Sequence, residues 1–287
     1  MRCSVGLGIV VCLILSGCGP LKHHRTTTWL NQINPFAGNP GDKIVVRTYL
    51  LEQPVGDTYL THDLWTQTLK PLPAEKHALL GENGLRVGHF TGNPPYQFLT
   101  LARGPDVVKP LESTVLAGDA KLVPLAGPVP EMKFQSCAEI GMKPGQFDLK
   151  DVEIALSLTP SFGENGKVKL AFEPRVQHGH RQFGWRPTTD NTAFTWLDQK
   201  VQERFPTLKC EISLSPEEYL LIGPTEVPAN TLGGASFVNV TEGKARMRVL
   251  VIQVGKLASA PAEPNPGRKP GVVAAQASRP IARGQAD

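Results

Sequence analysis

The chain has few cysteines, few aromatic residues and little net charge. Its 287 residues include 5 Cys, 11 Phe, 4 Trp and 4 Tyr, and the formal charge at pH 7 is +4. A charge this small does not indicate a nucleic-acid-binding protein, because such proteins carry a strongly basic surface. So few cysteines also do not form the dense disulfide framework of a small secreted domain.

The chain also lacks the common catalytic motifs. It contains no G-x-S-x-G, H-E-x-x-H or P-loop sequence. His178 and His180 would share a face of a strand and could ligate a metal ion, but a third ligand such as His89 would have to come from the fold. We interpret this segment as a polar loop after a strand. We therefore predict no catalytic residue, no metal, no cofactor and no small-molecule substrate.

An apolar N-terminal segment predicts a secretory leader. Val5–Leu15 is shorter than the ~20 residues that a membrane-spanning helix needs and has the length of a signal-peptide core. The tetrapeptide Leu-Ser-Gly-Cys at its end resembles the lipobox of bacterial lipoproteins, in which cleavage precedes a cysteine that then carries lipid. This resemblance implies a leader over residues 1–17 and a lipid anchor in the cell envelope, at the outer membrane facing the periplasm. The motif residues are Leu15, Ser16 and Gly17, and the lipidated residue is Cys18.

Two flanking segments lack the pattern of folded structure. Residues 18–42 contain Pro20, Pro35 and Pro40 and predict a lipidated tether. Residues 256–287 are rich in Ala and Pro, have no aromatic residue and predict a disordered basic tail. We interpret this tail as solvated, the alternative being a basic arm that contacts anionic lipid, cell wall or a partner.

The remaining residues predict an α+β fold that is mainly β. Residues 43–103 mix strand and short helix patterns, including a helix from Ala74 to Leu80, and predict a small α+β unit. Residues 104–130 contain five Pro and predict a connector with one or two edge strands. Residues 131–255 alternate regularly and predict a domain built on an antiparallel sheet or sandwich.

The clearest pattern is a β-hairpin over Val152–Glu173. Apolar residues alternate with polar or small residues on both sides of the turn-forming segment 161–166. Phe147 and Leu149 have the opposite parity, which predicts a bulge or break near Lys150-Asp151.

Two later segments also predict strands. Leu208–Leu214 alternates, and Met247–Val254 is apolar on both parities near its end, which predicts a strand covered on both faces.

Cys210 lies on the apolar face of the first segment, whereas a strand over 132–140 would place Cys137 on a polar face. This mismatch favours two unpaired cysteines, although the expected compartment permits a disulfide.

The hairpin resembles the one that opens the C-terminal domain of secretins. Its sequence over Val152–Glu173, VEIALSLTPSFGENGKVKLAFE, has a strand ending in Thr-Pro, an Asn-Gly turn and a second strand, and Glu173–Val176 continues the match. Leu208–Gly223 is similar to paired secretin strands, and Arg246–Val254 to the final strand. The resemblance covers about residues 145–254 with gaps. It implies a β domain related to components of type II or III secretion systems.

The whole chain also resembles a group of planctomycete-type lipoproteins with a secretin-like C-terminal half. Leu64-Trp65, Asn83–Gly88 and Gln177–Gly179 carry this match. Residues 43–103 offer space for at most one of the N-terminal ring domains of pore-forming secretins. The resemblance therefore implies a fold rather than a channel.

Aromatic residues gather in the segment 181–206. With Arg181 and Arg204 beside them, their composition is typical of an interface. We predict a short helix over Asn191–Arg204, and its aromatic side chains would either pack as ordinary core against a sheet or form an interface. The candidate interface residues are Phe183, Trp185, Phe194 and Trp196.

Two functions from different classes fit these patterns. The favoured one is a non-catalytic, lipid-anchored envelope protein that binds a protein partner or forms a homo-oligomer. The alternative is a lipid-anchored hydrolase acting on cell wall or polysaccharide. The alternative requires a cleft that gathers His178, His180 and carboxylates.

Overall fold

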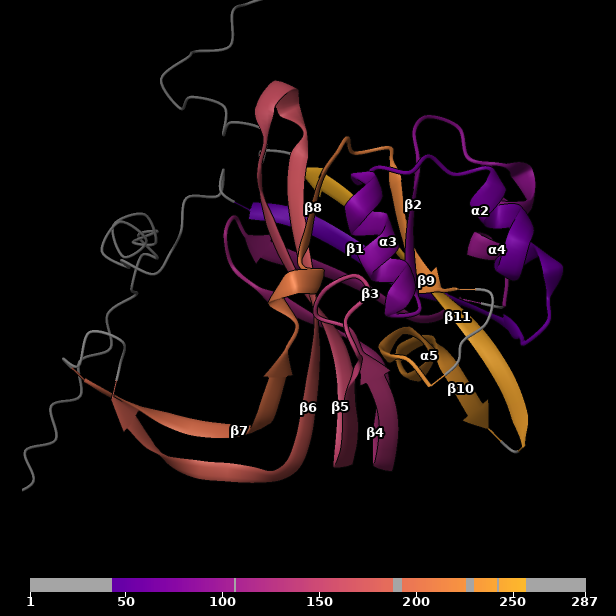
Figure 1. Ribbon diagram of the computed structural model, residues 1–287. Helices are drawn as coiled ribbons and strands as arrows, with labels where there is room; N and C mark the ends of the chain where they lie inside the picture. Colours follow the sequence, from indigo (N-terminus) through magenta and orange to yellow (C-terminus); the bar gives the residue numbers. More distant parts are fainter. Residues whose placement is uncertain (1–42, 106, 188–192, 226–229, 242, 257–287) are drawn as a thin grey trace, which may run out of the picture. The chain divides into compact units, whose positions relative to one another are not determined.

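Two antiparallel β-sheets carry most of the described structure (Figure 1). The computed structural model describes residues 43–105, 107–187, 193–225, 230–241 and 243–256. The predicted class, α+β and mainly β, is confirmed. No helix in these ranges is both long and apolar enough to span a membrane.

The first sheet brings the two ends of the described region together. Its strand order is β2-β9-β11-β1-β3, and β10 also pairs with β11. β1 and β11 pair from Ile44–Lys256 to Pro54–Arg246. The strands are β1 (Lys43–Pro54), β2 (Leu85–Phe90), β3 (Val107–Leu116), β9 (Tyr219–Pro224), β10 (Val238–Thr241) and β11 (Lys244–Lys256).

This pairing does not follow the predicted division of the chain. Residues 43–103 and 131–255 were expected to form separate units, but β1 and β2 from the first segment pair with β11 and β9 from the second. Strands β1 and β2 of residues 43–103 hydrogen-bond to strands β11 and β9 of residues 131–255. Both segments therefore contribute to a single sheet.

The second sheet contains the predicted hairpin. Its strand order is β4-β5-β6-β7, and β8 also pairs with β6. β5 and β6 pair from Glu153–Gln177 to Phe162–Val168, which confirms the hairpin over 152–173. The predicted connector supplies β3 and part of β4, which lie at an edge of their respective sheets, as expected. The strands are β4 (Lys121–Ser136), β5 (Gly145–Phe162), β6 (Val168–Pro187), β7 (Phe194–Arg204) and β8 (Cys210–Leu214).

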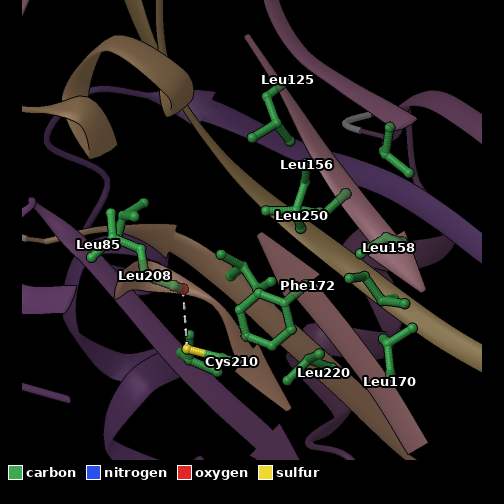
Figure 2. Close-up of a cluster of buried hydrophobic side chains, with 14 of the residues drawn as sticks. Leu85, Leu125, Leu156, Leu158, Leu170, Phe172, Leu208, Cys210, Leu220 and Leu250 are labelled. Atoms are coloured by element: carbon green, nitrogen blue, oxygen red, sulfur yellow. Dashed lines mark hydrogen bonds between the residues drawn. The ribbon is translucent and has the colours of Figure 1, made fainter. Parts of the chain in front are cut away.

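The main core lies between the two sheets. Figure 2 shows Leu156 of β5, Phe172 of β6 and Leu250 of β11 in this cluster. Every second residue of β8 is buried, as its alternation predicted. The predicted break in β5 is also confirmed, because Asp151 adopts a left-handed conformation with φ 53°. Phe147, Leu149 and Val152 therefore all pack on this same core.

Short helices cover other parts of the first sheet. A second apolar cluster contains Leu60 and Phe98 together with Val249 and Val251 of β11, so β11 is covered on both faces as predicted. The predicted helix at 74–80 is present as α3, and its Leu80 joins the main core. The helical elements are η2 (Tyr59–Asp63, a π-helical turn), α2 (Leu64–Thr66), α3 (Ala74–Glu82), α4 (Tyr96–Arg103), the 3-10 turns η3 (Glu164–Gly166) and η4 (Pro206–Leu208), and α5 (Leu232–Phe237).

The predicted helix over Asn191–Arg204 is wrong. Phe194–Arg204 forms the strand β7, which pairs with the distal part of β6. The segment carries a period-2 alternation, with Phe194 and Trp196 on one parity, and β6 supplies a long partner strand. Backbone pairing with β6 therefore outweighs the local helical spacing.

Candidate interaction site

The candidate site is the part of the β6–β7 hairpin that extends beyond the rest of the second sheet (Figure 1). β6 pairs with β8 up to Phe172 and with β5 up to Gln177, whereas its pairing with β7 continues to Pro187. Residues 182–187 and 194–199 therefore form a two-stranded ribbon, called the ribbon below. An isolated two-stranded hairpin is only marginally stable in water, so this ribbon depends on its base or on a partner.

Charged contacts fix the base of the ribbon to the sheet. Lys200 Nζ donates to Glu153 Oε1 and to the backbone oxygen of Asp151, both at 2.9 Å. Arg204 donates through Nη2 and Nε to the two carboxylate oxygens of Glu173, at 3.1 and 3.3 Å. Glu173 is 5 % exposed. These contacts bind β7 to β5 and β6 where the ribbon leaves the sheet.

The four candidate interface residues lie on one face of the ribbon. Trp185 pairs directly with Trp196, and Phe194 pairs with Pro187. Directly paired residues share a face, as do residues two apart on one strand, so Phe183 lies on that face too. Their exposed fractions range from 54 % for Trp196 to 70 % for Phe194.

The two tryptophans form the centre of this aromatic face. Their ring centroids are 5.3 Å apart and their planes meet at 73°, an edge-to-face arrangement. The interpretation of these aromatics as ordinary core is wrong, because all four side chains are exposed. A contiguous exposed apolar patch marks a contact site in a soluble protein, and aromatic residues are enriched where interfaces are buried. This face can therefore bind a partner by burying its apolar surface against it.

The two histidines do not form the shared face that their spacing suggested. Gly179, with φ 70°, lies where the β6–β7 register shifts. The His178 side chain is 19 % exposed and its Nε2 lies 3.3 Å from Glu203 Oε1. The His180 side chain is 99 % exposed and its Nδ1 lies 3.6 Å from Asp151 Oδ2. Both lie inside β6, so their assignment to a loop is also wrong.

His89 lies in the other sheet, on β2, where its Nε2 is 3.2 Å from Glu218 Oε2. Within the ranges that the structure describes, no group of three or more His, Cys, Asp or Glu is arranged to hold a metal ion.

Both cysteines in the described ranges are buried and unpaired, as predicted. The polar environment expected for Cys137 is wrong, because this residue follows the end of β4 and is 6 % exposed. Cys210 Sγ donates to the backbone oxygen of Leu208 at 3.4 Å (Figure 2). Burial raises the pKa of the Cys210 thiol to about 11, so the thiol is protonated at neutral pH and is a poor nucleophile.

The predicted anchoring residues Leu15, Ser16, Gly17 and Cys18 lie outside the described residues, as do the tether and nearly all of the tail. They remain predictions.

The sequence pattern identified the aromatic residues but not their shared face. Phe194 and Trp196 alternate with Thr195 and Leu197, and this period of two was the available signal for a strand. The register with β6, which places Trp185 opposite Trp196, cannot be obtained from either strand alone.

Comparison with known proteins gives no family assignment. No protein-family model matches the chain, and no curated protein matches it. One similar solved structure is the secretin-domain β-barrel of InvG from the Salmonella SPI-1 injectisome, with TM-score 0.19, 11 % identity, and coverage of 78 % of this chain and 63 % of that chain. InvG in the type III secretion injectisome gives TM-score 0.17, 10 % identity and coverage of 78 % and 65 %. This chain therefore spans less than two thirds of either InvG chain.

Proposed function

We propose that this chain is a non-catalytic, lipid-anchored protein of the bacterial cell envelope that associates with a second copy of itself through the aromatic face of the ribbon. The observation that carries the proposal is the alignment of four exposed aromatic side chains on one face of a two-stranded ribbon. Burial of this face removes apolar surface from water at roughly 25 cal/mol per Å².

A second copy is the partner that this face fits best. The four aromatic side chains lie on one face, and an apolar patch can bury itself against the same patch of a second copy across a two-fold axis. Edge-to-face contacts such as that between Trp185 and Trp196 can also form between two copies.

The envelope location and the secretin relationship rest on the sequence. The Leu-Ser-Gly-Cys tetrapeptide supports acylation of Cys18 at the outer membrane. The hairpin resemblance over Val152–Glu173 supports a relationship to secretion or outer-membrane assemblies. The fold alone does not assign transport.

The hydrolase alternative needs a cleft in which the two histidines converge with carboxylates. Instead, His178 contacts Glu203 and His180 contacts Asp151, with very different exposure. This geometry favours the binding function.

The assembly test is the native mass of the detergent-extracted full chain. We expect a dimer or larger assembly, and a monomer when Trp185 and Trp196 are both replaced by alanine. Tyr96→Ala is the matched control, because Tyr96 is an aromatic residue with 85 % exposure outside the ribbon. A monomeric wild-type chain, or loss of assembly in the Tyr96→Ala control, contradicts the proposal.

The anchor test is separate. Radiolabelled palmitate should label the wild-type chain and not a Cys18→Ala variant. Equal labelling of both, or labelling of neither, contradicts the lipid anchor while leaving the ribbon association intact.

A further inference from the structure

A second candidate site lies away from the ribbon, between the two sheets where β3 and β4 form their edges. A cavity of 220 Å³ opens there. This volume is smaller than the ~300–1,000 Å³ of sites for drug-sized ligands, so the cavity suits a small ligand. Its lining combines apolar residues with one cation, and includes Leu50, Leu111, Val123, Pro124, Leu250 and Lys109.

The cation, Lys109, lies where the pairing of β1 with β3 is irregular. The β1–β3 register shifts between Thr48 and Leu50, so Lys109 and Pro110 both lie opposite Tyr49. Lys109 has φ 50°, a left-handed conformation that is costly for a residue other than glycine. Bulges of this kind re-aim side chains next to functional sites. Here the bulge places Lys109 at the cavity.

Positive charge is in excess beside the cavity. Glu52 is 9 % exposed, and both of its carboxylate oxygens are already occupied, Oε1 by Arg246 Nε at 2.7 Å and Oε2 by Arg248 Nε. Two guanidinium groups therefore share one carboxylate. Arg248 and Leu250 are two apart on β11 and share a face, so this cluster adjoins the cavity wall.

Lys109 adds a third cation to this cluster. In the ranges that the structure describes, no carboxylate lies within ion-pair distance of its ammonium group, and Glu112 on the same strand pairs with Arg47. Burial and the charge of Arg248 lower the pKa of Lys109, while Glu52 opposes this effect. Three cationic side chains outnumber one carboxylate here, and an anion would offset this excess of positive charge.

We propose that this cavity binds a small amphipathic anion, a carboxylate or phosphate monoester with a short alkyl chain. Lys109 contacts the anionic head, and the apolar residues from β1, β4 and β11 surround the chain. Arg248 strengthens the attraction through its field. The apolar lining argues against inorganic anions, and the surplus positive charge argues against neutral or cationic amphiphiles.

Calorimetric titration tests this proposal. The full chain is held in nanodiscs of uncharged phosphatidylcholine, with empty discs as the blank, and titrated with octanoate and octyl phosphate below their micelle concentrations. We expect at least one of the two anions to bind. Selective binding of one identifies the head group as carboxylate or phosphate. Failure of both to bind overturns the proposal, as does equal binding of octyltrimethylammonium or inorganic phosphate.

Two variants locate the binding. Lys109→Asn removes the charge with a residue that tolerates φ > 0, and should weaken binding at least tenfold. Leu111→Asp places a negative charge in the lining at a partly exposed position and should abolish binding. Lys209→Asn, at an exposed lysine outside the cavity, should bind like the wild type. Unchanged affinity in Lys109→Asn overturns the proposal.

The site is independent of the ribbon. The chain with Trp185 and Trp196 replaced by alanine should bind the anion with wild-type affinity whether or not it assembles. Loss of binding in that variant would overturn the assignment to this cavity.

Discussion

Trp185 and Trp196 lie directly opposite each other on β6 and β7, with ring centroids 5.3 Å apart and ring planes at 73°. Such a pair contributes about 0.5–1.5 kcal/mol beyond the burial of its area. Both indoles are more than half exposed in the single chain. The contact therefore orders the ribbon and leaves its face accessible.

This exposure predicts that acrylamide quenches the two tryptophans strongly in dilute protein and weakly in concentrated protein, because association buries the aromatic face. The measurement is the quenchable fraction of tryptophan fluorescence against protein concentration. Replacing both residues by phenylalanine keeps the face aromatic and assigns the signal to the ribbon. Quenching that is independent of concentration would count against association through this face.

Glu173 and Arg204 provide a stability prediction at the base of the ribbon. The carboxylate is almost fully buried and accepts two hydrogen bonds from Arg204, while Arg175 Nη2 lies 3.6 Å away. Arg204→Ala leaves the buried carboxylate with one cationic neighbour. We expect a lower free energy of unfolding, measured by urea denaturation, because the buried carboxylate loses two charge-assisted hydrogen bonds. Lys209→Ala, an exposed change nearby in the sequence, should cost far less. Equal losses in both variants would refute this role of Glu173.

Asn83 links the end of α3 to the end of β4. It is fully buried. Its Oδ1 accepts from Ser136 Oγ at 2.7 Å and from the Cys137 N–H at 2.9 Å, and its Nδ2 donates to the backbone oxygens of Leu79 and Cys137 at 2.9 and 3.0 Å. All four hydrogen-bonding positions of the amide are therefore used.

Removing this amide should be costly. Asn83→Ala leaves the backbone N–H and carbonyl oxygen of Cys137 without the Asn83 amide as their partner. Each buried polar group without a partner costs about 1–3 kcal/mol. Asn83→Asp keeps the acceptor but turns an oxygen towards the backbone oxygens of Leu79 and Cys137 and buries a carboxyl group, so its denaturation midpoint should fall at least as far as that of the alanine variant. An alanine variant as stable as the wild type would show that water replaces these contacts.

The sequence predicted local pairing better than it predicted the choice of sheet. The hairpin over 152–173 was predictable because both strands alternate and the turn between them is short. β8 and β9 are also separated by a short turn, yet β8 pairs with β6 and β9 pairs with β2 and β11. Their partners are distant in sequence, and burial between the two sheets decides the outcome.

The same limit applies to the two candidate sites. The aromatic content of 181–206 indicated an interface, but its single face depends on the register between Trp185 and Trp196. The cationic cavity had no local signal at all. Glu52 and Arg248 are brought together only by the pairing of β1 with β11.

Glu218 gives the protein a predictable response to acid. Its Oε2 accepts the Ser215 N–H at 2.7 Å and lies 3.2 Å from His89 Nε2. Burial opposes ionisation of the carboxyl, but the Ser215 hydrogen bond and the charge of His89 outweigh it and hold the pKa of Glu218 below 4.5. Because the folded-state pKa is lowered, the carboxylate stabilises the fold above pH 4.5, and this contribution is lost as the pH falls through the folded-state pKa.

Glu218→Gln should therefore lower the free energy of unfolding by about 1 kcal/mol at neutral pH, and the gap to the wild type should narrow below pH 4.5. Urea denaturation at pH 7 and at a series of pH values descending from 4.5 measures how this gap changes. Glu217→Gln, at the exposed neighbouring position, should show no such narrowing. A gap that persists unchanged in acid would mean that Glu218 acts through its shape and neutral hydrogen bonds, because a contribution from the ionised carboxylate must disappear once the wild-type residue is protonated.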